Sequence, residues 1–126
     1  MRTFNIISNK GVNKIKADET ILKNIMSPHY TCTGGYFGDI ADQLLGTFYD
    51  CNHETVFLAI PLSNGTTARL KVCETISTSG LQFVLYDSED DIVCENILYE
   101  NNNYNINLTH VISTFVEILI MEACKL

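Results

Sequence analysis

The segment Ser63-Asn64-Gly65-Thr66 constrains the fold of this chain more than any other, because it separates two apolar runs, residues 55–62 and 67–76. Asn-Gly between two such runs is the strongest short-range signal for a β-hairpin, since both residues accept the positive φ that a tight hairpin turn requires. The middle of the chain is therefore predicted to form two antiparallel strands.

A two-residue turn at Asn64 and Gly65 also predicts the register of the hairpin. The expected cross-strand pairs are Phe57 with Val72, Ala59 with Leu70, Leu58 with Lys71 and Ile60 with Arg69. The last two pairs combine an apolar with a basic side chain, so their side of the hairpin is expected to be the more solvated one. Pro61 cannot donate a hydrogen bond to a neighbouring strand, which predicts that the first strand lies at a sheet edge there.

The remaining segments predict a single α+β domain over residues 1–126, an antiparallel β-meander of about four to six strands with helices mainly on one face. Further strands are expected at residues 2–8, 12–16, 81–86 and 92–99. Two short helices are expected in the N-terminal half, one from Asp18 to about Met26 and one from Asp39 to about Tyr49, because apolar side chains recur there at helical spacing. The glycine-rich segment 33–38 between them is expected to be a loop.

A long C-terminal helix from Leu108 to Cys124, packed on the sheet, is the clearest helix prediction. Its apolar side chains cover much of the helix circumference, which is typical either of a helix held inside the core or of one that pairs with a second chain. The second possibility predicts a homo-oligomer with Ile120 and Met121 at the interface.

The balance of charge excludes some classes of protein. The chain has 126 residues, with 8 Lys and Arg against 15 Asp and Glu, and a formal net charge of −7. Phosphate contacts need clustered Lys and Arg, so direct binding of nucleic acid is not expected. The sequence has no apolar stretch of signal-peptide or membrane-span length, and its five cysteines are widely spaced. A cytoplasmic protein without disulfides, and without a membrane partner, is therefore expected.

The charge is unevenly distributed along the chain. Residues 1–71 have a net charge of +1, whereas residues 72–126 carry nine acidic residues against Lys125 alone, a net charge of −8. This asymmetry predicts contact with a partner protein that has a basic surface. The residues expected to make this contact are Asp87, Glu89, Asp90, Asp91, Glu95 and Glu100. The alternative is that these carboxylates only keep a small domain soluble, and the run matches a calcium-binding loop only loosely.

A second interpretation assigns the chain a small anionic ligand such as a nucleotide. Backbone amides at Gly34 and Gly35 would hold a phosphate, and Arg69 and Lys71 would supply positive charge. The glycine-rich segment lacks the Lys-Ser/Thr of a P-loop, so a structural turn accounts for it better than a phosphate site does. The two basic residues also fit ordinary surface positions.

No catalytic motif is present, and the His and Cys residues give no ligand set for a metal or cofactor. The chain is therefore not expected to be an enzyme. The leading hypothesis is a binding protein that inhibits a larger partner by occupying its basic, nucleic-acid-handling surface, as phage counter-defence and toxin-immunity proteins do. The alternatives are a protein that sequesters an anionic ligand, and a homo-oligomeric structural protein.

Overall fold

The computed structural model describes residues 2–17, 35–62, 64–75, 80–99 and 108–125. These segments form an antiparallel sheet and two helices, which confirms the α+β class. The strands are β1 (Arg2–Ser8), β2 (Gly11–Ala17), β3 (Val56–Pro61), β4 (Thr67–Glu74), β5 (Gly80–Tyr86) and β6 (Ile92–Tyr99). The helices are α2 (Gly35–Asp50) and α3 (Leu108–Cys124). No described helix is long and apolar enough to cross a membrane.

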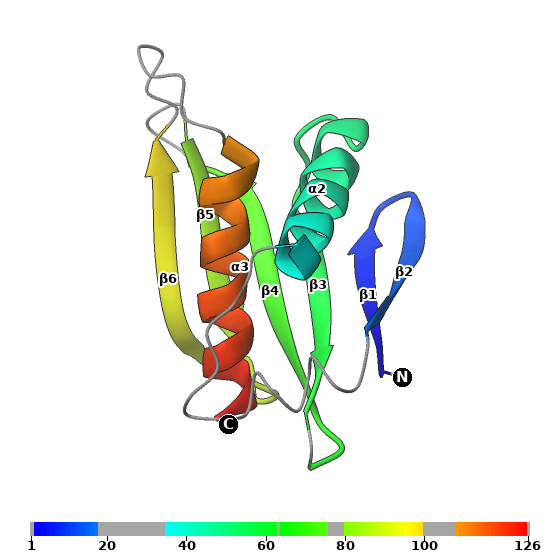
Figure 1. Cartoon of the computed structure of the whole chain (residues 1–126), viewed down its shortest axis with the longest axis vertical. Coiled ribbons are helices and arrows are strands. Elements are labelled where there is room, and N and C mark those ends of the chain that lie inside the picture. Colours follow the sequence, from blue (N-terminus) through cyan, green and yellow to red (C-terminus); the bar gives the residue numbers. More distant parts are fainter. Residues whose placement is uncertain (1, 18–34, 63, 76–79, 100–107, 126) are drawn as a thin grey trace.

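The six strands lie in the order β2-β1-β3-β4-β5-β6. The predicted meander is correct from β3 to β6, but at the N-terminal end β1 rather than β2 lies beside β3 (Figure 1). Burial explains this order, because β1 contributes Phe4 and Ile6 to the core. The sequence of β2 holds Lys14 and Lys16, and lysine suits an outer strand that faces water.

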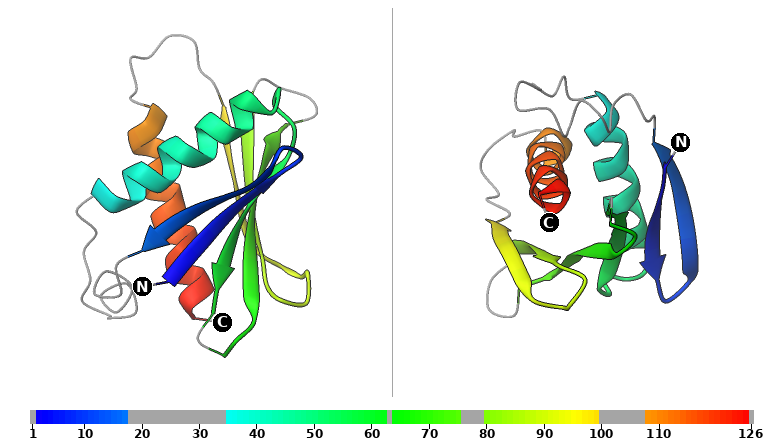
Figure 2. Two further views of the ribbon diagram at one scale, coloured as in Figure 1. Left: turned by 90° about the vertical axis from the view of Figure 1, so that its right-hand side faces the viewer. Right: turned by 90° about the horizontal axis from the view of Figure 1, so that it is seen from below.

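Both helices cover one face of the sheet, and no described helix covers the other face (Figures 1 and 2). Successive strand residues point to opposite faces, so each inner strand buries every second side chain beneath the helices. In β4, for example, Ala68, Leu70 and Val72 are buried, whereas Arg69 and Lys71 are half-buried on the opposite side. We call the side without helices the outer face.

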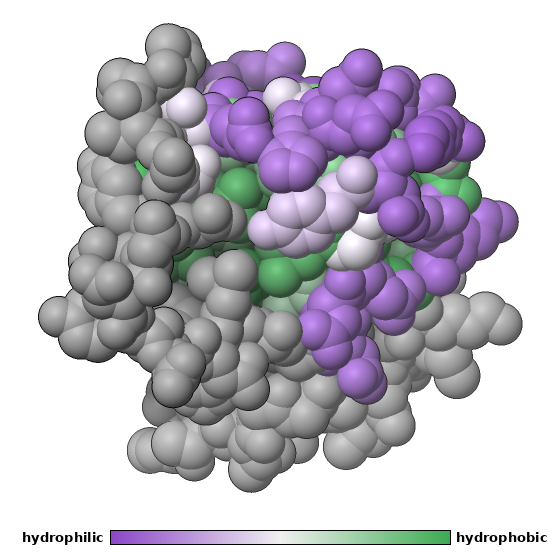
Figure 3. Space-filling view, turned by 90° about the horizontal axis from the view of Figure 1, so that it is seen from above, coloured by the Kyte–Doolittle hydropathy of each residue, from purple (hydrophilic) through white to green (hydrophobic). Residues whose placement is uncertain are grey.

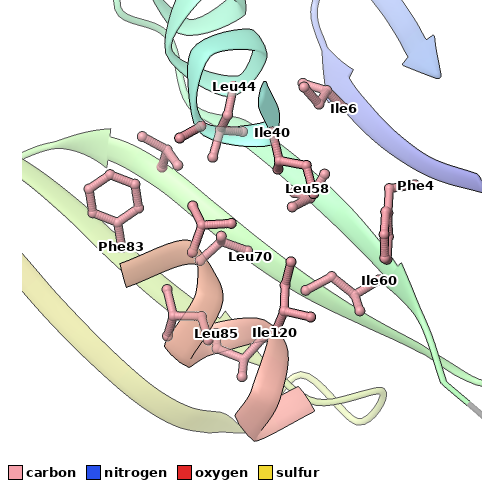
Figure 4. Close-up of a cluster of buried hydrophobic side chains, with 14 of the residues drawn as sticks. Phe4, Ile6, Ile40, Leu44, Leu58, Ile60, Leu70, Phe83, Leu85 and Ile120 are labelled. Atoms are coloured by element: carbon pink, nitrogen blue, oxygen red, sulfur yellow. The ribbon is translucent and has the colours of Figure 1, made fainter. Parts of the chain in front are cut away.

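The core fills the space between the helices and the sheet. Ile40 and Leu44 from α2, and Ile120 from α3, converge with strand residues such as Leu58 and Leu70 (Figure 4). Each fully buried aliphatic side chain of this kind contributes about 1.5–3 kcal/mol relative to an exposed one. The predicted bounds of the C-terminal helix are confirmed, and Ile120 on that helix is part of this core.

The observed hairpin register differs from the predicted one by one residue. The pairs are Phe57 with Lys71, Leu58 with Leu70, Ala59 with Arg69 and Ile60 with Ala68. The Leu62 N–H donates to the Thr66 carbonyl at 2.8 Å, so the loop between the two strands has three residues instead of two. Gly65 in this loop takes a φ of +85°. The Asn-Gly dipeptide fits a three-residue hairpin loop as well as a two-residue turn. The extra residue places apolar side chains opposite one another beneath the helices.

The N-terminal helices also differ from the prediction. α2 begins at Gly35, so part of the glycine-rich segment expected as a loop forms the first helical turn. With 16 residues, α2 is nearly as long as α3, which has 17. The helix expected from Asp18 to Met26 lies outside the described residues.

β3 lies inside the sheet, between β1 and β4, so it is not an edge strand as a whole, and the prediction of an edge concerned Pro61 alone. The register of β1 with β3 runs from Asn5 opposite Ala59 to Ile7 opposite Phe57 and does not extend to Pro61. Pro61 therefore lies beyond the part of β3 that pairs with β1, as expected for a residue that cannot donate a hydrogen bond to a neighbouring strand.

Gly65→Ala and Gly46→Ala form a matched pair that tests the turn. Gly65→Ala is expected to destabilise the chain by about 1–2 kcal/mol, because a side chain is disfavoured at its positive φ. Gly46 is exposed on α2 with no atom within 4 Å of an added Cβ, so Gly46→Ala is expected to stabilise by about 0.5–1 kcal/mol. Urea denaturation measures both. A Gly65→Ala variant as stable as wild type would contradict the observed turn.

Ile120→Ala and Ile118→Ala separate a core residue from an exposed one on the same helix. Ile120 is fully buried and Ile118 is 44% exposed. Ile120→Ala is expected to lower the free energy of unfolding by about 2–5 kcal/mol, and Ile118→Ala by about 0.5 kcal/mol or less. Thermal and urea unfolding measure the difference, and similar losses for both variants would contradict the placement of α3.

Candidate protein-binding surface at the β6 end of the sheet

The centre of the outer face is covered by its own long side chains. The Arg69 guanidinium carbon lies 5.1 Å from the centre of the Phe57 ring and 5.9 Å from that of Tyr86, and the Lys71 Nζ lies 5.6 Å from the Tyr86 ring centre. Cation–π contacts of this kind hold basic side chains flat on a sheet while their stems cover apolar atoms. Val84, on the same face, is consequently only 1% exposed.

Exposed apolar side chains lie instead at the two lateral ends of the outer face. Six large apolar residues of the described segments are exposed, and the pairing register places four of them on this face. Ile7 and Val12 lie on β1 and β2, next to the exposed Lys14. Ile92 and Ile97 lie on β6, where they are 60% and 42% exposed.

A β-bulge brings Ile92, Glu95 and Ile97 to the same face of β6. In a regular strand, residues three positions apart point to opposite faces. Here Cys94 pairs with Leu85 whereas Ile92 pairs with Tyr86, and the register shifts between these two pairs. The extra residue in β6 turns Ile92 outward, toward the side on which Glu95 and Ile97 already lie.

The turn between β5 and β6 carries most of the acidic residues singled out in the sequence, and Asp87 organises it. The Asp87 carboxylate accepts hydrogen bonds from the backbone N–H groups of Glu89 at 2.9 Å and Asp91 at 3.0 Å. The Asp87 N–H donates to the Asp91 carbonyl at 2.9 Å, and Asp90 adopts a φ of +66°. Asp87 is thus occupied in fixing the backbone of the turn. Figure 2 shows this turn curling away from the helices.

Asp90 forms an ion pair with Arg69 across the outer face. Glu89 and Asp91 are exposed, and neither carboxylate has an ion-pair partner in the described part of the chain. Glu95 is exposed on the outer face of β6 and accepts a hydrogen bond from the Gln82 amide at 3.3 Å. Glu100 lies outside the described residues.

The structure therefore divides the predicted acidic set into two groups. Asp87 is held by the backbone of the turn and Asp90 by Arg69, whereas Glu89, Asp91 and Glu95 are exposed beside two exposed isoleucines and have no ion-pair partner among the described residues. We call the group Glu89, Asp91, Ile92, Glu95 and Ile97 the β6 patch. The sequence indicated its carboxylates, but nothing in the sequence indicates the bulge that turns Ile92 to the same side.

The described residues of the predicted anion site do not come together. Arg69 and Lys71 lie on the outer face, whereas Gly35 begins α2 in the helix layer on the opposite side of the sheet. Gly34 lies outside the described residues. The charge of Arg69 is balanced by Asp90, so the positive group nearest to Tyr86 with no acidic partner in the described segments is Lys71.

The residues of the predicted oligomer interface lie at or near the core. Ile120 is 0% exposed, and Met121 is partly buried and packs against the core. Among the side chains of this helix that the structure describes, Ile118 is the large apolar one that is exposed.

A polar junction at the C-terminus of α2 was not predicted from the sequence. Asn52 and His53 both have positive φ and end the helix, with the His53 N–H donating to the Phe48 carbonyl at 3.0 Å. The His53 ring pairs with Glu74 and lies 5.0 Å from the Tyr49 ring. Figure 3 shows hydrophilic side chains gathered at this end of the molecule. These contacts end α2 and join it to the sheet, so we assign this junction a structural role.

Cys51, Cys73 and Cys94 are free, and no group of three potential metal ligands occurs in the segments that the structure describes. Burial raises the pKa of the Cys94 thiol, and the negative charge of Glu122 raises it further. A raised pKa lowers the thiolate fraction at neutral pH, so Cys94 is a weak nucleophile.

Asp87→Ala and Glu89→Ala test the division of the acidic turn. Asp87→Ala removes the acceptor of two backbone N–H groups and is expected to destabilise the chain by about 1–2 kcal/mol. Glu89→Ala leaves the backbone bonds intact and is expected to change stability by less than about 0.5 kcal/mol. Urea unfolding compares them. If both variants are as stable as wild type, Asp87 does not organise the turn.

The β6 patch thus combines two exposed apolar side chains with three solvent-facing carboxylates on a strand and turn whose backbone is fixed. Comparison with protein-family models, with curated proteins and with solved structures gives no match to this chain.

Proposed function

We propose that this chain is a cytoplasmic binding protein that inhibits a larger protein by occupying a basic surface on it, with the β6 patch as the contact. The observation that carries the proposal is the β6 patch itself, in which Ile92 and Ile97 are exposed beside carboxylates that have no cationic partner among the described residues. Nucleic-acid-handling proteins have basic surfaces of the kind that such a patch complements.

The distribution of charge supports a basic partner. Residues 72–126 carry a net charge of −8, and both the acidic turn and β6 belong to this part. Opposite potentials on two surfaces speed their encounter and disfavour wrong partners. Asp90 already neutralises Arg69, so the charge that the β6 end offers to a partner is negative.

The composition of the β6 patch supports a protein partner rather than a small ligand. Protein interfaces combine a desolvated apolar centre with a polar rim, and a few anchor side chains supply most of the affinity. Ile92 and Ile97 fit the role of anchors, and Glu89, Asp91 and Glu95 fit the rim. The hydrogen bonds of Asp87 hold the turn in one conformation before binding, which reduces the entropy lost on association.

Charge reversal at the free carboxylates tests the proposal without disturbing the turn. Tagged wild-type chain is used to retain its partner from the cells that produce it, and the affinity of the retained protein is then measured by titration. Glu89→Lys with Asp91→Lys is expected to weaken binding at least about tenfold, since like charges would meet across the interface. The salt dependence of the affinity is expected to fall as well.

The matched control is Asp39→Lys with Asp42→Lys, which makes the same charge change at exposed positions of α2. This control is expected to bind as wild type does. Equal affinities for wild type and for both double variants would contradict the proposal, as would equal losses in both variants, because only total charge would then matter.

A further inference from the structure

β6 is an outer strand of the sheet, and in the described part of the chain only β5 pairs with it. An outer strand has a row of backbone N–H and C=O groups that another extended chain can bind. Lys or Pro on an outer strand opposes unwanted pairing with another chain. The two outer strands of this sheet differ in this respect. β2 holds Lys14 and Lys16, whereas the eight residues of β6 include no Lys, Arg or Pro.

The two sides of β6 differ in chemistry. On the outer face Ile92 and Ile97 flank Glu95, whereas toward the helices Cys94 and Leu98 are partly buried and pack against the core. An added strand would alternate in the same way. Its outward side chains would lie beside the carboxylate of Glu95, and its inward ones beside Cys94 and Leu98, with the half-buried Asn96 between them.

We propose that an extended, basic segment of the partner protein binds along β6 as a seventh strand of the sheet. This inference rests on the proposed function and adds its mode of binding. Backbone hydrogen bonds to β6 supply affinity, and alternating basic and apolar side chains supply specificity. The expected segment therefore carries Lys or Arg at every second position.

Charge distinguishes this occupant from a second copy of the chain. Antiparallel pairing of β6 with β6 of another molecule would bring the two Glu95 side chains, near the middle of the strand, close together, and parallel pairing would also bring together the two sets of turn carboxylates. Like charges on neighbouring strands oppose pairing. Glu95 thus disfavours self-association and favours a basic strand.

The test uses the full chain and an acetylated, amidated eight-residue peptide of alternating lysine and valine. Two control peptides have the same sequence and charge, one with methylated backbone nitrogens at every lysine and the other at every valine. In a bound strand the N–H groups of alternate residues point to opposite edges, so only one of these sets faces β6. Strand addition predicts that one control binds at least about tenfold more weakly and that the other binds as the parent does.

The test also uses amide hydrogen exchange of β6 and a neutral variant, in which amides replace the carboxylates of the β6 patch. The parent peptide is expected to slow exchange at alternate residues of β6. Glu89→Gln with Asp91→Asn and Glu95→Gln is expected to weaken its binding, whereas Asp39→Asn with Asp42→Asn on α2 is not.

Four outcomes are distinguished. Loss of binding in one methylated control, together with slowed exchange in β6, supports strand addition. Equal binding of all three peptides that still depends on the carboxylates of the β6 patch contradicts strand addition and leaves the proposed function in place. Absence of binding contradicts strand addition and leaves the proposed function to the charge-reversal test above, whereas binding that the neutral variant does not weaken contradicts both.

Discussion

The register between β3 and β4 decides the chemistry of both faces of this sheet. A loop closed by Leu62 and Thr66, with Gly65 at positive φ, places Leu58 opposite Leu70 and Ala59 opposite Arg69. A shift of one residue would turn one strand's apolar side chains to water and its basic ones to the core. Neither helix could then bury its apolar stripe, so the core and the outer face both depend on this turn.

The outer face is organised by the charges that this register brings together. Arg69 lies on the rings of Phe57 and Tyr86 and pairs with Asp90 from the turn between β5 and β6. These contacts cover the centre of the face and neutralise the charge of Arg69. Unpaired acidic groups therefore gather at the β6 end, where the bulge adds Ile92 to the same surface. The negative, partly apolar character of the β6 patch follows from the fold as well as from the composition.

Local patterns predicted much of the fold, and long-range pairing supplied the rest. The helix Leu108–Cys124 was found from its apolar periodicity, which depends only on neighbouring residues. The hairpin was found from Asn64 and Gly65, but this dipeptide suits loops of two and three residues, so its register was predicted wrongly. The contact of β1 with β3 joins residues about fifty positions apart, and no local signal specifies it.

The same distinction applies to the β6 patch. The acidic turn was identified from its run of carboxylates, because such runs lie in solvent. That Asp87 caps backbone N–H groups and that Asp90 pairs with Arg69 depends on the conformation of the turn and on the pairing of β4 with β5. Charge alone could not separate these two residues from Glu89, Asp91 and Glu95.

The central claim is that the β6 end of the outer face, and not the helix layer, meets the partner protein. It is tested most directly by amide hydrogen exchange of the full chain, free and bound to the protein that it retains from its own cells. The account predicts slowed exchange from residue 89 to residue 98, with α2 and α3 unchanged. Protection confined to the helices, with exchange in β6 unaffected, would contradict it.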